Sequence, residues 1–197
     1  MKKFTAIIFD FGGVLSSVDD VSEIGQYLAR KYHVSPRVVM QITNRGWKRA
    51  RINPSYDRIF WRELAHALGI SQNILQKEYL LFPRLSLDVV QLVRKLRKRY
   101  VVGMLSNQIQ TWHLTLMKQW KLQRLFNPIV TSYGEGVAKP DPKIYKRLLR
   151  KLKIPADECI YIDDRKNNLP PAKRLGMQTI LFKTPRQLKR DLKRLRI

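Results

Sequence analysis

The sequence has a single cysteine among its 197 residues, Cys159. One cysteine cannot close an intrachain disulfide, and it cannot supply a cysteine-based metal cage. The chain also lacks an apolar run long enough to cross a bilayer, and its Met-Lys-Lys start leads into a strand-like segment rather than a cleavable signal. We therefore expect a cytoplasmic protein with no membrane partner.

Acidic residues are scarce as well: 15 Asp and Glu face 39 Lys and Arg, for a formal net charge of +24. Most of this excess lies in residues 85–197. Such a charge attracts anions and makes nucleic acid a conceivable partner. Solvated helix faces explain the same charge, however, and neither a zinc-finger spacing nor the aromatic-rich sheet of RNA-binding modules accompanies it. Nucleic-acid binding is therefore kept as an alternative that the pattern does not favour.

The chain divides into two regions with different patterns of apolar residues. Residues 17–84 repeat apolar positions at helical spacing and contain no convincing strand, apart from a short extended flap expected over residues 14–20. Residues 85–197 alternate helix and strand patterns, with strands expected over residues 100–106, 128–132, 159–164 and 178–182. Strands separated by helices in this way predict an α/β fold, a parallel sheet covered on both faces, with a small all-helical insertion after its first strand.

Polar side chains follow the apolar runs of the expected strands. The run of residues 7–9 ends in Asp10, and Gly12 and Gly13 then allow a sharp turn and a close approach to a ligand. Further polar groups come after later strands or in the loops between them: Ser106 and Asn107, Lys139, and Asp163 and Asp164. Each of these has an ordinary structural explanation by itself. Because parallel strands end at one edge of a sheet, together they indicate one site, and the adjacent carboxylates favour a cation there.

Four short motifs carry a family resemblance. Phe-Asp-Phe-Gly-Gly-Val at residues 9–14, Leu-Ser-Asn at 105–107, Ala-Lys-Pro-Asp-Pro at 138–142 and Tyr-Ile-Asp-Asp at 161–164 occur in the order of the haloacid dehalogenase superfamily, which the chain resembles over nearly its whole length. The resemblance implies a Rossmann-like three-layer core formed by residues 1–16 and 85–197. It also implies that residues 17–84 form a helical cap domain of the superfamily's first cap class.

The branch that the chain resembles most contains sugar-1-phosphate phosphatases and the amino-terminal phosphatase domains of epoxide hydrolases. The two-glycine loop and the Phe-Trp-Arg-Glu-Leu segment at residues 60–64 carry this resemblance. It implies hydrolysis of a small phosphorylated substrate through an aspartyl-phosphate on Asp10. A carboxylate that attacks an anionic phosphate needs a cation, and the family's cofactor is Mg²⁺, a hard ion that prefers oxygen ligands.

The resemblance also implies the roles of the other site residues. Mg²⁺ would be held by Asp10, the backbone carbonyl of Gly12 and Asp163, with Asp164 acting through water. Lys139 would balance the charge that develops on the phosphoryl group. The expected phosphate-binding groups are the amides around Phe11, Gly12 and Gly13, together with Ser106, Asn107 and Lys139. Asn168 would support the paired carboxylates without contacting the metal.

The sequence departs from the common phosphatase pattern at Gly12, where most of these enzymes carry a second Asp that protonates the leaving oxygen. Such a group contributes on the order of 10²–10⁴-fold to the rate. We therefore predict slow turnover of alkyl phosphates and a preference for better leaving groups, such as sugar 1-phosphates. A 2-haloacid dehalogenase, which needs neither metal nor proton donor, is an alternative that the paired Asp163 and Asp164 disfavour.

Other residues are less informative. His33, His66 and His113 lie in three different helical segments without metal-ligand spacing, so we expect surface or core roles for them. Residues 47–51, Trp-Lys-Arg-Ala-Arg, could face the substrate from the cap or form a solvated helix end. Both a monomer and a homodimer are compatible with the sequence.

Overall fold

The computed structural model describes residues 4–18 and 21–197 and contains one five-stranded sheet, in which every neighbouring pair of strands is parallel. The strands lie in the order β3-β2-β1-β4-β5, so β1 occupies the centre. Their bounds are β1 Ala6–Phe9, β2 Val101–Ser106, β3 Ile129–Thr131, β4 Cys159–Asp163 and β5 Gln178–Leu181. The register pairs Ile8 of β1 with Gly103 on one side and Tyr161 on the other. The predicted parallel α/β fold is confirmed.

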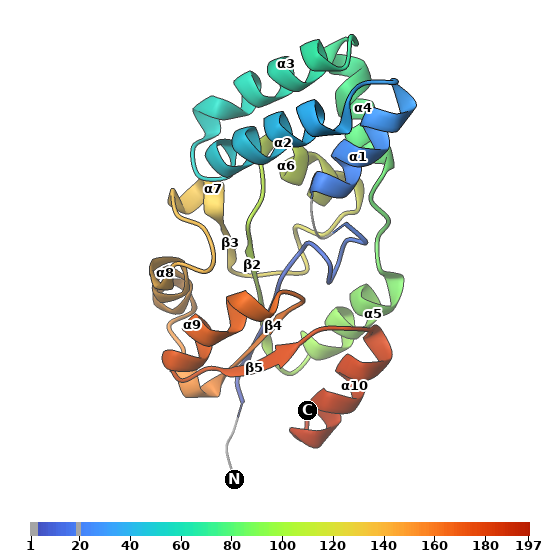
Figure 1. Cartoon of the computed structure of the whole chain (residues 1–197). Coiled ribbons are helices and arrows are strands. Elements are labelled where there is room, and N and C mark those ends of the chain that lie inside the picture. Colours follow the sequence, from blue (N-terminus) through green and yellow to red (C-terminus); the bar gives the residue numbers. More distant parts are fainter. Residues whose placement is uncertain (1–3, 19–20) are drawn as a thin grey trace.

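Helices connect the strands and cover both faces of the sheet (Figure 1). The α-helices are α1 Val21–Lys31, α2 Pro36–Ala50, α3 Asp57–Ala67, α4 Gln72–Leu81, α5 Leu87–Leu96, α6 Gln110–Gln119, α7 Ser132–Glu135, α8 Pro142–Leu152, α9 Leu169–Arg174 and α10 Pro185–Arg194. The short 3-10 helices of the described residues are η1 Pro54–Tyr56, η2 Ala156–Glu158 and η3 Lys166–Asn168.

The two faces of β1 pack against different helices, because successive side chains of a strand point to opposite sides. Ile7 and Phe9 belong to a cluster that includes buried residues of α5, α6 and α10. Ala6 and Ile8 belong to a second cluster with buried residues of α8 and α9. This continuous burial of β1 on both faces explains why its sequence is an unbroken apolar run.

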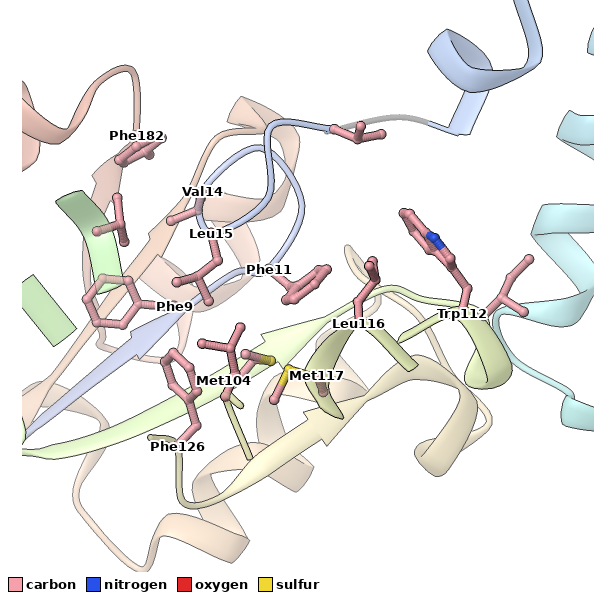
Figure 2. Packing of buried hydrophobic residues seen from close by; sticks show 14 of the residues in the cluster. Phe9, Phe11, Val14, Leu15, Met104, Trp112, Leu116, Met117, Phe126 and Phe182 are labelled. Atoms are coloured by element: carbon pink, nitrogen blue, oxygen red, sulfur yellow. The ribbon is translucent and has the colours of Figure 1, made fainter. Parts of the chain in front are cut away.

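The first cluster extends beyond the end of β1 towards α6 (Figure 2). Phe9 packs edge-on against Phe126, with ring centroids 6.4 Å apart. Phe11, in the loop after β1, packs edge-on against His113 of α6 at 5.0 Å. Aromatic contacts therefore anchor this loop on both sides of Asp10.

Helices α1 to α4 lie between β1 and α5 in the chain and stand together at one end of the sheet (Figure 1). Local signals set their ends: Pro36 begins α2, and the Ser71 hydroxyl accepts a hydrogen bond from the backbone N–H of Ile74 at 3.3 Å at the start of α4. Buried residues of these helices continue the same cluster that covers one face of the sheet. The helical insertion therefore shares apolar core with the sheet.

Some predicted boundaries are wrong. The third strand ends at Thr131, one residue early, because the Thr131 hydroxyl accepts a hydrogen bond from the backbone N–H of Gly134 at 3.2 Å and caps the short helix α7. The expected extended flap instead begins with a turn, since the backbone N–H of Leu15 donates to the Phe11 carbonyl at 2.9 Å. The end of the predicted flap, residues 19–20, lies outside the described residues, as do residues 1–3. Within residues 4–18 and 21–197, no helix is both long and apolar enough to cross a membrane.

Candidate active site

Asp10 directly follows the central strand and is buried at its carboxyl end. Its backbone N–H donates to the Ile162 carbonyl of β4 at 2.9 Å, which extends the sheet pairing by one residue. One carboxylate oxygen, Oδ1, accepts from the backbone N–H of Phe11 at 2.7 Å. The other, Oδ2, lies 2.7 Å from Nζ of Lys139. Both carboxylate oxygens are therefore held by fixed donors.

Lys139 joins the ends of three strands. It is only 2% exposed, and its ammonium group contacts Asp10, donates to Asp163 Oδ2 at 2.7 Å and donates to the Leu105 carbonyl at 3.0 Å. Its backbone is held by the Asn107 side chain, which accepts from the Lys139 N–H at 2.9 Å and donates to the Lys139 carbonyl at 3.0 Å. The three protons of the ammonium group are thus directed at three oxygens.

Asp163 is fully buried at the end of β4 and accepts hydrogen bonds on both oxygens. Besides Lys139, the Tyr161 hydroxyl donates to Oδ2, the Arg165 backbone N–H donates to Oδ1 at 2.8 Å, and the Asn168 amide donates to Oδ1 at 2.9 Å and to Oδ2 at 3.0 Å. So many donors fix both the position and the negative charge of this carboxylate.

These contacts shift the pKa values of the buried groups in different directions. Burial and, to a smaller degree, the neighbouring carboxylates raise the pKa of Asp10 well above its ordinary value, although Lys139 opposes the shift. Burial would also raise the pKa of Asp163, but Lys139, Tyr161 and the Arg165 N–H outweigh it and hold that pKa below its ordinary value. Burial would lower the pKa of Lys139, which Asp10 and Asp163 nevertheless raise. The Lys139 ammonium is therefore charged at neutral pH.

Asp164, the next residue, lies against the two-glycine loop. A Cβ atom on Gly13 would fall 2.1 Å from Asp164 Oδ2, so a side chain at position 13 would collide with this carboxylate. One oxygen each of Asp10, Asp163 and Asp164 can be chosen so that all three lie within 4.8 Å of one another. Three carboxylates so close together, with the ammonium group of Lys139 beside them, form a set of oxygen donors that fits a hard divalent cation such as Mg²⁺.

The expected phosphate-binding groups have different surroundings. Ser106 is fully buried, and its hydroxyl has no hydrogen-bond partner among the described residues. The Asn107 amide, in contrast, holds the backbone of Lys139. Of the three loop amides, the Phe11 N–H donates to Asp10 and the Gly13 N–H donates to the Val18 carbonyl at 3.1 Å, whereas Gly12 lines the cavity beside Asp10.

A cavity of about 460 Å³ opens over Asp10. Its described walls come from the loop after β1, from α2, from the residues after β2, from Lys139 and Pro140, and from residues 165–168. Trp47 in the last turn of α2 and Arg51 directly after the helix supply one wall, so both ends of the segment 47–51 face the cavity. The exposed Lys48 and Arg49 between them lie outside it. The volume suits a small ligand.

Several residues around the site were not singled out from the sequence. Gln108, Arg165 and Lys166 line the cavity, and the buried side chains of Tyr161 and Tyr145 contact Asp163 and Asn168. The Tyr145 hydroxyl donates to the Asn168 carbonyl at 2.7 Å, which helps to hold Asn168 against Asp163. One signal was available: Tyr161 stands two residues before Asp163 on one strand, so both side chains lie on the same face. The positions of the other residues depend on long-range packing.

Comparisons with known proteins agree with this geometry. A family model described as haloacid dehalogenase-like hydrolase matches residues 4–176. A haloacid dehalogenase family enzyme from Bacteroides thetaiotaomicron, solved as a magnesium complex, superposes with a TM-score of 0.75 at 25% sequence identity, covering 92% of this chain and 94% of that one.

Two curated proteins match smaller parts of the chain. The glyceraldehyde 3-phosphate phosphatase of Pyrococcus furiosus is 33% identical over 104 residues, which make up 51% of this chain and 42% of that protein. Bifunctional epoxide hydrolase 2 of Rattus norvegicus is 36% identical over 74 residues, 38% of this chain and 13% of that protein. Each match spans less than half of the relative's own length.

Proposed function

Because the chain belongs to the haloacid dehalogenase-like hydrolases, we propose that it is a phosphatase that removes phosphate from a small phosphorylated metabolite. The observation that carries the proposal is the buried group of Asp10, Lys139 and Asp163, with Asp164 beside it, in which Asp10 and Lys139 line a cavity. The likeness to a glyceraldehyde 3-phosphate phosphatase over half of this chain supports it.

Asp10 is the nucleophile in this proposal. Its carboxylate attacks phosphorus, the bond from phosphorus to the leaving oxygen breaks, and an aspartyl-phosphate forms. Water then attacks the same phosphorus, releases inorganic phosphate and regenerates the carboxylate. The Phe11 N–H and the Lys139 ammonium hold the two oxygens of Asp10 before the reaction, so the carboxylate does not have to reorient.

Mg²⁺ would be held by Asp10, the Gly12 carbonyl and Asp164. When bound, it supplies positive charge that offsets the repulsion between the carboxylate and the phosphate. The contacts of Asp163 lead us to revise its expected role, because its oxygens already accept from Lys139, Tyr161, Asn168 and the Arg165 N–H. We assign Asp163 to orienting Lys139, and Asp164, beside Gly13, to direct contact with the metal.

The remaining groups bind the phosphoryl oxygens. Ser106 offers a hydroxyl that has no partner among the described residues, and Lys139 places a positive charge beside Asp10. Residues 17–84 act as the cap of this proposal, since Trp47 and Arg51 bring α2 to the cavity that contains Asp10. A cap in this place would exclude water and contact the leaving group.

The leaving group has to depart with little help from a proton donor. Gly12 offers none, and the described wall of the cavity contains no His, Glu, Tyr or Cys side chain. Its only carboxyl group belongs to Asp10, the nucleophile. We therefore propose that sugar 1-phosphates, aryl phosphates and acyl phosphates are better substrates than simple alkyl phosphates.

A dehalogenase would use the same aspartate without a metal. Lys139 already balances Asp10 and Asp163, so the argument against a dehalogenase rests on Asp164, because a third carboxylate this close adds repulsion that a bound metal cation would offset. A metal-free reaction gains nothing from this third carboxylate.

Phosphate release from a panel of phosphomonoesters, with and without Mg²⁺, tests the proposal. We expect metal-dependent release that falls to background in Asp10→Asn, which keeps the size of the side chain but removes its charge. Within the panel, kcat/KM should rise as the pKa of the leaving group falls. Release that survives in Asp10→Asn, or no release from any phosphomonoester, would refute the phosphatase. Equal kcat/KM for alkyl phosphates and sugar 1-phosphates would refute the role given to Gly12.

A further inference from the structure

The cap wall of the cavity consists of an aromatic ring and an arginine. Trp47 lies in the last turn of α2, and Arg51, four residues later, is the C-cap residue that directly follows the helix with a helical backbone, so the two side chains point to the same side. The indole of Trp47 packs edge-on against Trp112 of α6, with ring centroids 6.1 Å apart. Trp112 is itself fixed, since its indole N–H donates to the Tyr79 carbonyl at 2.9 Å. Trp47 thus presents a supported ring to the cavity.

The described wall of the cavity is strongly asymmetric in charge. Its cationic residues are Arg51, Lys139, Arg165 and Lys166, and its one acidic residue is Asp10. Lys139 contacts Asp10 and Asp163, Arg51 directly follows α2, and Arg165 and Lys166 belong to the segment after β4. A guanidinium group binds a carboxylate or a phosphate through two parallel hydrogen bonds. The wall therefore suits a ligand with an anionic group besides the phosphate that reacts at Asp10.

A third observation concerns Gln108. The residue lines the cavity, is only 4% exposed, and its Oε1 atom is buried without a hydrogen-bond partner among the described residues. Rotation about the last side-chain bond exchanges the oxygen and the nitrogen, so Gln108 can present either an acceptor or a donor. Buried polar groups normally have partners, and a ligand hydroxyl would supply one here.

We propose that the leaving group of the substrate is a hydroxylated ring that carries a second anionic group. This inference rests on the phosphatase proposed above and names its substrate class: a phosphorylated sugar acid or a sugar bisphosphate. Trp47 stacks on the ring, Arg51 binds the second anion, and Gln108 pairs with a ring hydroxyl. Trp47, Arg51 and Gln108 are the specificity-determining residues.

Three substrates with the same anomeric leaving oxygen test the second anion. Glucose 1-phosphate is neutral at carbon 6, glucuronic acid 1-phosphate carries a carboxylate there, and glucose 1,6-bisphosphate carries a phosphate. We expect at least one of the two anionic substrates to exceed glucose 1-phosphate in kcat/KM by about tenfold, mainly through a lower KM. The better of the two identifies the anion as carboxylate or phosphate.

Arg51→Gln should remove this preference, lowering kcat/KM much more for the anionic substrates than for glucose 1-phosphate. Arg62→Gln is the matched control, because it makes the same change at an exposed position of α3 outside the cavity, and it should keep the preference. Equal kcat/KM for all three substrates in the unaltered protein, or a preference that survives in Arg51→Gln, overturns the inference.

An aryl phosphate measured alongside separates the two proposals. If it is hydrolysed with Mg²⁺ while no anionic preference is found, the phosphatase stands and the substrate class is wrong. If neither the aryl phosphate nor any sugar phosphate is hydrolysed, both proposals fail.

For Gln108, replacement by Met keeps the side-chain length and removes the amide. We expect kcat/KM to fall for the hydroxylated ring substrates and to stay within twofold for the aryl phosphate, and an equal fall for both would exclude pairing with a hydroxyl.

Discussion

Gly13 matters to the site because it has no side chain, which leaves room for a neighbouring carboxylate. Its backbone has φ of 65°, in the left-handed region that favours glycine, and its missing Cβ leaves room for the Asp164 carboxylate. Gly69, two residues after α3, has φ of 67°, but no heavy atom other than those of its chain neighbours lies within 4 Å of where its Cβ would be. The two glycines share a conformation and differ in what surrounds them.

Alanine substitutions at these two positions distinguish the strain of a left-handed backbone from a steric clash between the new Cβ and Asp164. Gly13→Ala and Gly69→Ala should each destabilise the fold by about 1–2 kcal/mol through the left-handed backbone. Only Gly13→Ala should displace Asp164, and we expect the Mg²⁺ concentration for half-maximal phosphate release to rise roughly 10- to 100-fold. Chemical denaturation and metal titration measure the two effects. An unchanged Mg²⁺ requirement in Gly13→Ala would argue against Asp164 as a ligand.

His113 is a buried titratable residue outside the proposed chemistry. Its Nδ1 lies 3.1 Å from the Tyr133 hydroxyl, and its ring packs edge-on against Phe11. Burial lowers the pKa of His113 from 6.5 to about 4, so the folded protein keeps the ring neutral where an unfolded chain would protonate it. Burial likewise raises the pKa of Tyr133, which stays protonated. The expected core role for this histidine agrees with its burial.

The consequence is a loss of stability in acid. Between pH 6.5 and pH 4 the unfolded chain binds a proton at His113 that the folded protein does not, so the free energy of unfolding falls as the pH falls, by up to about 3 kcal/mol. His113→Phe should flatten this part of the stability profile, as measured by urea denaturation at pH 7.5, 6 and 5. If the variant and the unaltered protein lose the same stability over this range, the histidine is not responsible.

At the scale of elements, helix α6 is capped from the helical insertion. Its N-cap residue, Ile109, provides no side-chain cap. Instead, the Asp57 carboxylate of α3 accepts a hydrogen bond from the Thr111 backbone N–H at 2.8 Å. A negative group at the start of a helix also interacts favourably with the helix dipole. This bond links the insertion to a helix that packs on the sheet.

Asp57→Ala should lower the free energy of unfolding by about 1 kcal/mol, the usual loss when a cap is removed. Ser71→Ala removes the cap of α4 inside the insertion and should cost a similar amount. Only Asp57→Ala should increase hydrogen exchange of the Thr111 amide, because only that variant breaks the link to α6. Faster exchange at Thr111 in both variants would mean that the insertion unfolds as one unit and that the link is not specific.

For the whole molecule, the dominant property is the net charge of +24. Charge of this size attracts anions over distances of about 10 Å at 0.1 M salt and less at higher salt. We expect KM for phosphorylated substrates to rise several-fold between about 20 and 500 mM NaCl, while kcat changes little, because Asp10 and Lys139 are buried. Steady-state kinetics across this range of NaCl concentrations tests the predicted rise in KM. A salt-independent KM would show that the excess charge does not act on the substrate.

The same net charge is the basis of the alternative function, the binding of oligonucleotides. The affinity of a nucleic-acid-binding protein falls steeply with salt, since bound phosphates release counterions. Salt-dependent binding in the absence of any phosphate release would favour this alternative over the phosphatase. Hydrolysis that is indifferent to added oligonucleotide would exclude a shared site.

Sequence patterns predict much of the architecture. Apolar runs of strand length between helical repeats led to the parallel sheet, and the four motifs led to the family that the comparisons show. Short-range signals such as Pro36 and Ser71 located helix starts, because a cap depends on neighbours in the chain. The predicted third strand extends one residue too far, because the Thr131 hydroxyl caps α7 where the strand ends.

The apolar runs of the sequence are enough to place Asp10, Ser106 and Asp163 at strand ends, because these runs become parallel strands whose carboxyl ends share one edge. The partner of each polar group follows instead from the packing of the whole chain: the Asn107 amide holds the backbone of Lys139, and hydrogen-bond donors surround Asp163. Packing also brings the end of α2 to the cavity. These contacts join residues far apart in the chain, so they depend on how the helices pack and not on any local pattern.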